Sequence, residues 1–358
     1  MLVEALRTRD FRRILLIKLS AVGDVVHTLP VLAKLRQRFP AAQIDWLIKP
    51  ECADLVRCHP ALSGLVSFPR RAAGGAWPQA VQMMAALRAV RRARYELAVD
   101  LQGQMRSAAF ALASRAPVRI GFARAREGAW LAYSHRIPVP SLDHHAADRN
   151  LWLGRLLGFA PDAPDFRLYL PPDAVPATAA LLLRHGLVGR RFAVLVPGTL
   201  WQTKHWSIAG FATVGRHLAE RGLSVVLAGA DRDRPLAAAV AAACPGAIDL
   251  AGETSLGRLA ALLQQAAICV TNDSGPMHIA AALGTPVVAA FGPTNPVRTG
   301  PYGQPDAVVR AGVPCSPCYI RRLRRCPHQH RCMTTLAPAM MIDRIERTLA
   351  RPAGSPAA

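Results

Sequence analysis

The sequence predicts an α/β protein made of two doubly wound, Rossmann-like domains that face each other across a cleft. Two observations carry this prediction. Short apolar runs of strand length alternate along the chain with amphipathic segments of helical period. A proline-rich passage at 159–180 interrupts the alternation, which then begins again. Two similar halves joined by a linker predict a cleft between them, where ligands bind.

The first half opens with a strand at 13–18, because RILLIK is short, apolar and followed by a turn. A helix is expected over 28–39, where leucines recur at helical spacing. The rest of this half is expected to contain a strand at 43–49, an amphipathic helix at 76–95 and a strand at 96–103. Strand, helix and strand with short links form the unit of a parallel sheet.

The second half repeats this pattern after the linker. Segments that begin as strands and end as polar loops are expected at 192–206, 223–234, 267–275 and 285–296. Helices are expected at 207–222, 256–266 and 276–284. The predicted domains are therefore 1–170 and 171–350, with a frayed tail at 351–358.

Composition limits the classes of partner. The net charge of +21 predicts an anionic partner, which can be a nucleic acid, an anionic membrane face or a phosphorylated substrate. Of 44 cationic residues only four are lysines, and Lys204 is the single lysine after Lys49, which indicates a need for a compact ammonium there. No uninterrupted apolar run reaches membrane-spanning length, and the start has no signal-peptide pattern, so a cytoplasmic protein is expected.

The segment VTNDSGPMHIAAALG predicts an anion site at a helix N-terminus. Pro276 fits the first turn of a short helix and Gly284 the position just after its end. Asp273, Ser274 and Gly275 would then lie where backbone N–H groups and the helix dipole favour a diphosphate, and His278 lies one turn further on. The alternative is that Asp273 or Ser274 simply caps a buried helix.

Two further loops carry candidate ligand contacts. Thr199 and Lys204, in the loop after a strand, have a hydroxyl and an ammonium that suit phosphate, although a solvated surface lysine is the alternative. Asp233, after the next strand, suits a ribose hydroxyl pair, or belongs to a solvated acidic turn. The chain contains neither G-x-G-x-x-G nor a Walker A sequence, which removes the main support for a NAD enzyme or an ATPase.

The first strand leads into LSAVGDVVHTLP, where Asp24 follows Gly23. This aspartate is either a helix cap or a catalytic carboxylate at the carboxyl end of a parallel strand. Arginines and histidines in other loops of the first half could bind a polyanionic acceptor, with an ordinary basic surface as the alternative.

Four stretches together resemble one family. KLSAVGDVVHTLPVL, VDLQGQMRSA, LVPGTLWQTKHW and VTNDSGPMHIAAALGTPVVAAFGPTNP are similar, in this order, to motifs of the lipopolysaccharide heptosyltransferases, glycosyltransferase family 9. The resemblance extends over nearly the whole chain. It implies the two-domain GT-B fold and transfer of heptose from ADP-heptose, with inversion and without a metal, to Kdo or heptose of the lipopolysaccharide inner core.

The resemblance also implies roles for individual residues. Asp24 would be the general base, beside Gly23, and Lys204 would stabilise the departing diphosphate together with Ser274, Gly275 and His278. The other implied contacts are Asp273 with the sugar hydroxyls, Thr199 with the phosphates, Asp233 with the adenosine ribose, and Arg106, Arg126 and His145 with the acceptor.

Four of the eight cysteines cluster as Cys315, Cys318, Cys326 and Cys332. They are candidate ligands of a structural zinc ion, with His328 or His330 as alternatives, although the spacing matches no standard zinc module. The other interpretation is reduced thiols in a basic loop. Their purpose does not follow from the transferase chemistry.

The expected partners are a nucleotide-sugar donor, a lipid A–Kdo acceptor and the anionic inner face of the cytoplasmic membrane. No cofactor, nucleic acid or protein partner is expected. One alternative is a GT-B enzyme that uses another nucleotide sugar. The other is a basic nucleic-acid-binding protein, which would need aromatic residues interleaved with the arginines, and only 6% of residues are aromatic.

Overall fold

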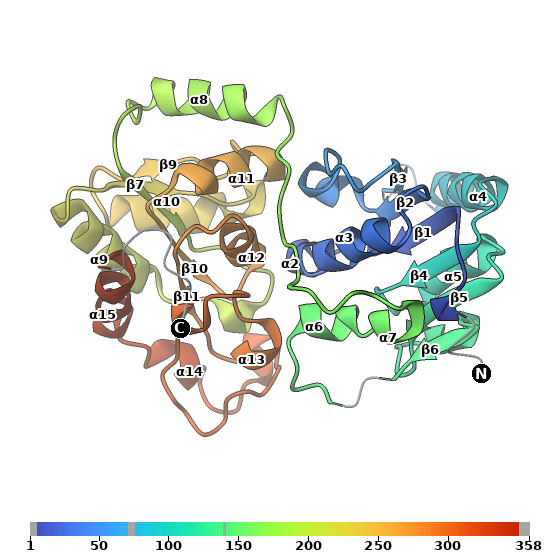
Figure 1. The fold of residues 1–358 in the computed structure, drawn as a ribbon. Coiled ribbons are helices and arrows are strands. Elements are labelled where there is room, and N and C mark those ends of the chain that lie inside the picture. The colour runs from blue at the N-terminus through green and yellow to red at the C-terminus, as the bar shows by residue number, and fades with distance from the viewer. Residues whose placement is uncertain (1–5, 71–75, 139–140, 351–358) are drawn as a thin grey trace. The chain divides into compact units, whose positions relative to one another are not determined.

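The computed structural model describes residues 6–70, 76–138 and 141–350, so the expected tail at 351–358 lies outside the described residues. The chain divides into two compact units, Met1–Tyr169 and Leu170–Ala358, here called the N-terminal and C-terminal units (Figure 1). Each unit is a parallel β-sheet covered by helices, which confirms the predicted α/β class.

The sheet of the N-terminal unit has the strand order β3-β2-β1-β4-β5-β6. Its strands are β1 (Arg13–Ile17), β2 (Gln43–Ile48), β3 (Gly64–Ser67), β4 (Leu97–Asp100), β5 (Val118–Phe122) and β6 (His135–Ile137). Its helices are α2 (Val22–Val26), α3 (Leu29–Arg38), α4 (Ala76–Arg92), α5 (Met105–Ala113), α6 (Ala146–Leu151) and α7 (Gly154–Leu157), with 3₁₀ turns η1 (Pro50–Leu55) and η2 (Ala129–Ala132).

The core of this unit follows from the two-residue period of its strands. Leu15 and Ile17 point to one face of β1 and join a buried cluster that includes Phe110 of α5 and Tyr133 after η2. The intervening Leu16 is also fully buried, so both faces of β1 are covered. Strands buried on both faces are the continuous apolar runs that the sequence shows.

The sheet of the C-terminal unit has the order β12-β11-β10-β7-β8-β9. Its strands are β7 (Phe192–Val196), β8 (Ser224–Leu227), β9 (Ile248–Asp249), β10 (Ile268–Asn272), β11 (Val287–Ala290) and β12 (Val308–Val309). Its helices are α8 (Ala174–Arg184), α9 (Ile208–Glu220), α10 (Arg234–Ala242), α11 (Leu256–Gln265), α12 (Gly275–Ala282), α13 (Pro296–Thr299), α14 (Arg331–Thr334) and α15 (Pro338–Leu349). Its 3₁₀ turns are η3 (Gln202–Lys204), η4 (Asp231–Asp233), η5 (Pro305–Ala307) and η6 (Leu323–Arg325).

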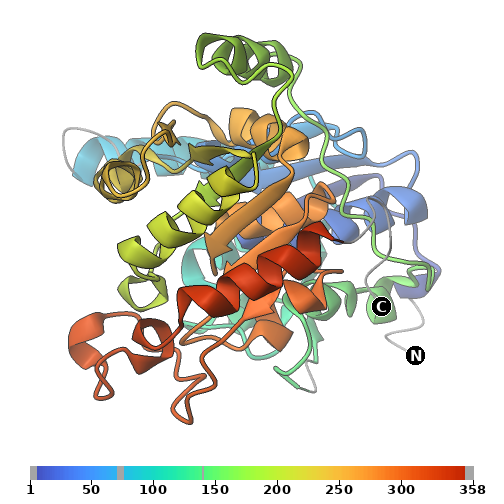
Figure 2. The ribbon, with the colours of Figure 1, turned by 90° about the vertical axis from the view of Figure 1, so that its left-hand side faces the viewer.

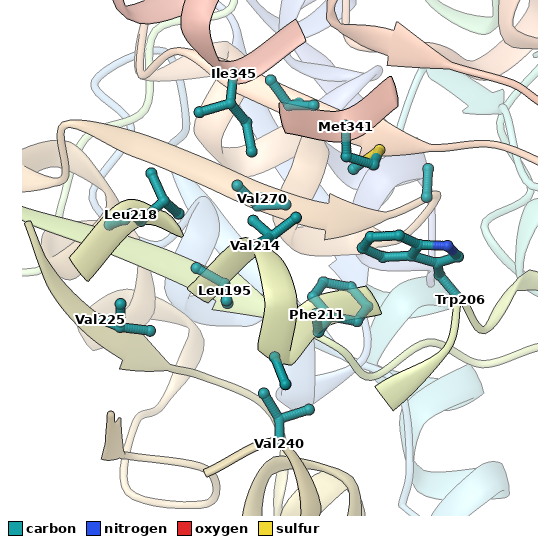
Figure 3. Close-up of a cluster of buried hydrophobic side chains, with 14 of the residues drawn as sticks. Leu195, Trp206, Phe211, Val214, Leu218, Val225, Val240, Val270, Met341 and Ile345 are labelled. Carbon is teal, nitrogen blue, oxygen red and sulfur yellow. The ribbon is translucent and has the colours of Figure 1, made fainter. Parts of the chain in front are cut away.

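Helices α9 and α15 pack together on one face of this second sheet (Figure 2). Between them and the strands lies an apolar cluster that contains Leu195 of β7, Val270 of β10, Phe211 of α9 and Met341 of α15 (Figure 3). Trp206 closes one end of the cluster, and its indole N–H donates to the Leu336 carbonyl at 2.9 Å. This cluster fixes the strand that carries the loop of Lys204.

Both sheets share one topology. When the strands of each unit are numbered along its own chain, both orders are 3-2-1-4-5-6, the order of dinucleotide-binding sheets. The order reverses between β1 and β4 in the N-terminal unit and between β7 and β10 in the C-terminal unit. Ligands of such sheets bind beyond the carboxyl ends of the strands at this switch point.

The predicted linker is shorter than expected. Residues from Ala174 onward form α8, although the proline-rich passage was expected to extend to 180. Pro176 lies in the first turn of α8, where no intrahelical N–H donor is needed, so the proline does not prevent the helix. Among the described residues, no helix is long and apolar enough to cross a membrane.

Candidate active site

Asp24 lies at the switch point of the N-terminal unit, in α2 directly after β1. Its Oδ2 accepts a hydrogen bond from the Ala21 N–H at 3.3 Å, so the capping interpretation of this residue is confirmed. The side chain is nevertheless 48% exposed, and the nearest ammonium, Lys18 Nζ, is 3.9 Å from Oδ1. The carboxylate therefore caps α2 and remains accessible to a ligand. Gly23, the residue before it, is buried and accepts the His27 N–H at 2.9 Å.

Gln102, after the neighbouring strand β4, holds the loop that carries Asp24. Its Oε1 accepts the N–H groups of Leu19 at 3.0 Å and Ser20 at 3.3 Å. Lys18 is held from the same side, because its Nζ donates to the Leu101 carbonyl at 2.9 Å. The sequence singles out no such role for Gln102, because the contact depends on β1 and β4 being neighbours in the sheet.

A fully buried carboxylate, Asp100, organises the loop of Gln102. It accepts the N–H groups of Gln102 at 2.9 Å and Gly103 at 3.1 Å, and Tyr133 donates its hydroxyl at 2.8 Å. Burial raises the pKa of Asp100, although these hydrogen bonds act in the opposite direction. The same burial and the neighbouring carboxyl raise the pKa of Tyr133, so this phenol stays a hydrogen-bond donor.

The three other predicted acceptor residues are Arg106, Arg126 and His145. Arg106, exposed at the start of α5, donates to Gln104 Oε1 at 2.8 Å, and Gln104 in turn accepts from Gln102. The Arg126 N–H donates to the Gly103 carbonyl at 3.0 Å, which ties the loop after β5 to the loop after β4. The Arg106 side chain and the Arg126 backbone are therefore both tied to the loop after β4, at the carboxyl edge of the sheet.

His145 lies on a different element. Its Nδ1 accepts the Ala147 N–H at 3.2 Å and caps α6. Its ring packs edge-on against His27, with 4.8 Å between the ring centres, and His27 is the residue that ends α2. His145 therefore reaches the neighbourhood of Asp24 through α2, whereas Arg106 does so through Gln104 and Gln102.

In the C-terminal unit the predicted anion-binding helix is α12, which begins directly after β10. Pro276 lies in its first turn and Gly284 follows its end with a φ of 74°, as the sequence predicts. Ser274 is the N-cap residue but makes no side-chain capping bond, because its hydroxyl lies 2.9 Å from Thr271 Oγ1. The first N–H groups of α12 therefore receive no side-chain cap from Ser274, which favours a ligand at this end of the helix over a plain cap.

Lys204 and Asp273 form an ion pair at the switch point of this unit. Lys204 Nζ is 2.6 Å from Asp273 Oδ2, and the two side chains are only 14% and 4% exposed. Thr294 also donates its hydroxyl to this carboxylate oxygen, and Thr199 donates to the Asp273 carbonyl at 3.2 Å. Three predicted donor-site residues thus share one hydrogen-bonded group, because the loops after β7 and β10 are adjacent in the sheet.

Aromatic and cationic side chains extend this group. The Lys204 ammonium lies 4.6 Å above the ring of Trp201, and the Arg321 guanidinium lies 4.5 Å from the same ring. Two cations on one indole concentrate positive charge beside the N-terminus of α12, a suitable environment for a diphosphate. His278, in the first half of α12, is buried.

Asp233 lies where β8 ends. Its Oδ2 accepts the Ala230 N–H at 2.9 Å, and its side chain is 10% exposed. A Cβ atom on Gly198 would lie 2.3 Å from the Asp233 carboxyl carbon, so only glycine fits between β7 and this carboxylate. The carboxylate is thus brought to the edge of the site by close packing against the loop after β7.

The cysteine-rich segment 315–332 supports the loop of Lys204. Thr203 donates its hydroxyl to the Ile320 carbonyl, and His330 Nε2 lies 2.6 Å from the Thr203 carbonyl oxygen. The Leu323 N–H donates to Gln202 Oε1 at 3.3 Å. The segment therefore has a structural part in the donor half-site, which the sequence did not reveal because the contacts join residues more than 115 positions apart.

The four cysteines of this segment are free thiols. Burial, and then the neighbouring thiols of Cys318, Cys315 and Cys326, raise the pKa of Cys332 to about 11. Within residues 6–70, 76–138 and 141–350, no three His, Cys, Asp or Glu side chains are grouped so that they could hold a metal ion. The structure thus provides no coordination site in support of the zinc hypothesis.

Solved structures share this arrangement of two sheets. A family 9 glycosyl transferase from Veillonella parvula matches with a TM-score of 0.80 at 22% identity, over 95% of this chain and 97% of the other. The Escherichia coli heptosyltransferase WaaC with ADP matches with a TM-score of 0.75 at 25% identity, over 94% and 99% of the two chains. The chain has the GT-B fold of glycosyltransferases.

Sequence comparisons give the family. The model of glycosyltransferase family 9 (heptosyltransferase) matches residues 83–329. Lipopolysaccharide heptosyltransferase 1 of Pseudomonas aeruginosa is 32% identical over 369 residues, covering 95% of this chain and 99% of the relative. Lipopolysaccharide heptosyltransferase 1 of E. coli K12 is 28% identical over 84% of this chain and 93% of the relative. The chain belongs to glycosyltransferase family 9 and is an enzyme of that family.

Proposed function

We propose that the chain transfers heptose from ADP-heptose, with inversion, to Kdo or heptose of the lipopolysaccharide inner core. The proposal rests on the residues that lie at the two switch points. One holds an accessible carboxylate, Asp24, and the other holds a cationic group and a helix N-terminus at Lys204 and α12. The family assignment supports it, as does a structural relative at 25% identity, the E. coli heptosyltransferase WaaC with ADP-2-deoxy-2-fluoro heptose.

In this mechanism the N-terminal unit binds the acceptor and Asp24 is the general base. As the acceptor hydroxyl oxygen forms its bond to the anomeric carbon, its proton moves to the Asp24 carboxylate. Attack on the face opposite the leaving group inverts the anomeric configuration. Arg106, Arg126 and His145 would hold anionic groups of the acceptor, because they surround the loops beside Asp24.

The C-terminal unit binds the donor. When the bond between the anomeric carbon and the diphosphate oxygen breaks, negative charge develops on that oxygen. Lys204 and the N–H groups of Ser274 and Gly275 would stabilise this charge, since they are fixed before the reaction. His278, in the first half of α12, would help to stabilise the departing diphosphate. Thr199 would contact the phosphates, and Asp233 would hold the adenosine ribose.

Asp273 would have two roles. It would hold hydroxyl groups of the donor sugar, and it positions the Lys204 ammonium, whose Nζ lies 2.6 Å from Asp273 Oδ2. A diphosphate close to Lys204 would share this ammonium with the carboxylate. The pairing with Asp273 limits the cost of burying the Lys204 ammonium.

The proposed acceptor is carried by lipid A, so we place the enzyme at the inner face of the cytoplasmic membrane. The net charge of +21 favours contact with anionic headgroups. The acceptor sugar stays open between Kdo and heptose, and defined core acceptors would distinguish the two.

The test is a donor panel with the purified protein. Calorimetry should show saturable binding of ADP-heptose and much weaker binding of UDP- and GDP-sugars, and NMR of the product should show an inverted anomeric centre. Saturable binding of another nucleotide sugar in place of ADP-heptose would favour a different GT-B transferase. Salt-sensitive binding of an oligonucleotide without any donor binding would favour the nucleic-acid-binding alternative.

A further inference from the structure

Helix α4 has an unusual outer surface. The structure describes all of its residues, and Val90 is the one fully buried among them. The half-buried Met83 and Leu87 face the core of the N-terminal unit. The opposite side of a surface helix is normally polar, yet here Trp77 is 79% exposed, Val81 52% and Met84 48%.

The apolar surface continues onto the neighbouring elements. Helix α5 packs against both α4 and η2 (Figure 1). Met105 and Leu112 of α5 are each 53% exposed, and Leu131 of η2 is 69% exposed. A Cβ atom on Gly128 would lie 3.8 Å from a Met105 carbon and 3.9 Å from a Leu131 carbon, so these two side chains flank the same point. We call the six residues the docking face: Trp77, Val81, Met84, Met105, Leu112 and Leu131.

The segment that carries this face is strongly basic. Residues 76–138 contain ten arginines and three acidic residues. This segment therefore carries one third of the chain's net charge in less than one fifth of its length. Arg88, Arg91 and Arg92 are exposed on the last turns of α4. Of the three acidic residues, Asp100 is fully buried, whereas Glu127 is exposed and accepts the Met105 N–H.

The docking face also adjoins the acceptor half-site. A groove of about 600 Å³ between α4 and α5 is lined by the apolar residues Met83, Leu87, Met105 and Ala109 and by the polar residues Gln104, Arg106 and Glu127. Arg106 is hydrogen-bonded to Gln104, which connects through Gln102 to the loop of Asp24.

We propose that the docking face binds the surface of an anionic lipid bilayer. Exposed Trp, Met and Leu side chains can enter the boundary between headgroups and acyl chains, while the arginines pair with lipid phosphates. An apolar helix face with a cationic border fits this boundary better than it fits water. The inference rests on the proposed function in one respect, namely that the acceptor is lipid-borne.

The first test measures binding to vesicles that contain 30% phosphatidylglycerol, compared with phosphatidylcholine alone. We expect the wild type to sediment with the anionic vesicles only, and Trp77→Glu/Met84→Glu to lose at least tenfold in partitioning. Arg88→Gln/Arg91→Gln/Arg92→Gln should lose about 100-fold, since each surface arginine contributes roughly 1 kcal/mol. Equal partitioning of wild type and both variants would overturn the proposal.

Matched controls lie on the C-terminal unit. Leu183→Glu changes an apolar side chain of α8 that is 70% exposed, and Arg190→Gln removes an exposed arginine. Both should bind vesicles as the wild type does. Loss of a dimer in the Trp77→Glu/Met84→Glu variant, without any vesicle binding by the wild type, would show that the face joins two copies of the chain and would overturn the proposal.

Transfer assays separate this proposal from the proposed function. With a water-soluble, deacylated acceptor, the docking-face variants should retain wild-type turnover, whereas with acceptor embedded in anionic vesicles their rates should fall at least tenfold. If the wild type transfers nothing to either acceptor, the proposed function fails while the vesicle result still decides the docking face. Circular dichroism and thermal unfolding confirm that the variants fold.

Discussion

The two units share a strand order but differ in how they fill the switch point. In the C-terminal unit, Lys204 and Asp273 form a buried ion pair, with Thr294 and Thr199 bonded to the aspartate. In the N-terminal unit, Asp24 is 48% exposed and its nearest ammonium is 3.9 Å away. One topology thus presents a buried ion pair in one unit and an accessible carboxylate in the other.

The difference shows how one fold supports two chemical tasks. A buried pair is fixed in position, which suits stabilisation of a leaving diphosphate, and removing either partner leaves the other charge buried without its partner. An exposed carboxylate such as Asp24 is accessible to a ligand and can therefore accept a proton from it. Substitutions at the two switch points should therefore affect different properties.

The largest effect is expected from Asp24→Asn. The amide cannot accept the acceptor proton, so turnover should fall by about 10³-fold, within the range for loss of a general base. ADP-heptose affinity and the unfolding temperature should stay unchanged, because the residue is half exposed. Single-turnover kinetics measure the rate, titration calorimetry the donor affinity and thermal unfolding the third quantity. Near-normal turnover would remove Asp24 from the base role.

Asp273→Ala should affect stability instead. It leaves the Lys204 ammonium buried without its partner, and the free energy of unfolding of the C-terminal unit should fall by about 3 kcal/mol. Chemical denaturation measures this loss. The double variant Asp273→Ala/Lys204→Met, which removes both charges, should recover part of it, and a double variant less stable than the single one would contradict the explanation.

The pH dependence of stability should come from the N-terminal unit. Burial lowers the pKa of His59 to about 4, while Asp165 raises it and Arg167 lowers it. In the unfolded chain the His59 imidazole takes up a proton near pH 6.5, whereas in the folded chain it does not. The contribution of neutral, buried His59 to the free energy of unfolding is therefore fully present above pH 6.5 and is lost as the pH falls toward 4.

At pH 5 the free energy of unfolding should be about 2 kcal/mol lower than at neutral pH. Denaturation curves at pH 7.5 and 5.0 measure it, and His59→Gln should abolish this part of the pH dependence. A variant with the full wild-type pH dependence would assign the effect to other groups.

The smallest effect is expected from Gln102→Ala. It removes the acceptor of the Leu19 and Ser20 N–H groups and loosens the loop of Asp24, so turnover should fall about tenfold at unchanged donor affinity. Gln102→Glu keeps an oxygen at this position and should restore most of the rate. If both variants behave alike, the side chain does not act through these hydrogen bonds.

Much of the fold was predictable because local patterns determine it. The expected strand at 13–18 is β1 (Arg13–Ile17), and the expected helix at 28–39 is α3 (Leu29–Arg38). The start of α8 was missed because prolines suggest a linker even where Pro176 is compatible with a first helical turn. The expectations for Asp24 and for α12 came from the residue types that follow each strand, and these lie at the two switch points.

The contacts within each half-site were not predictable. Nothing local indicates that Lys204 pairs with Asp273, that Gln102 holds the peptide groups before Asp24, or that His330 supports Thr203. These contacts depend on which strands become neighbours, and the sheet order is decided by packing over the whole unit.

The sequence by itself therefore determined the α/β class, the alternation of elements and the polar residues that end each strand, because periodicity and turn chemistry act over a few residues. Only the tertiary structure decided which of those residues meet. Parallel strands far apart in sequence are joined side by side, and this adjacency buries Lys204 against Asp273 while it leaves Asp24 open to a ligand.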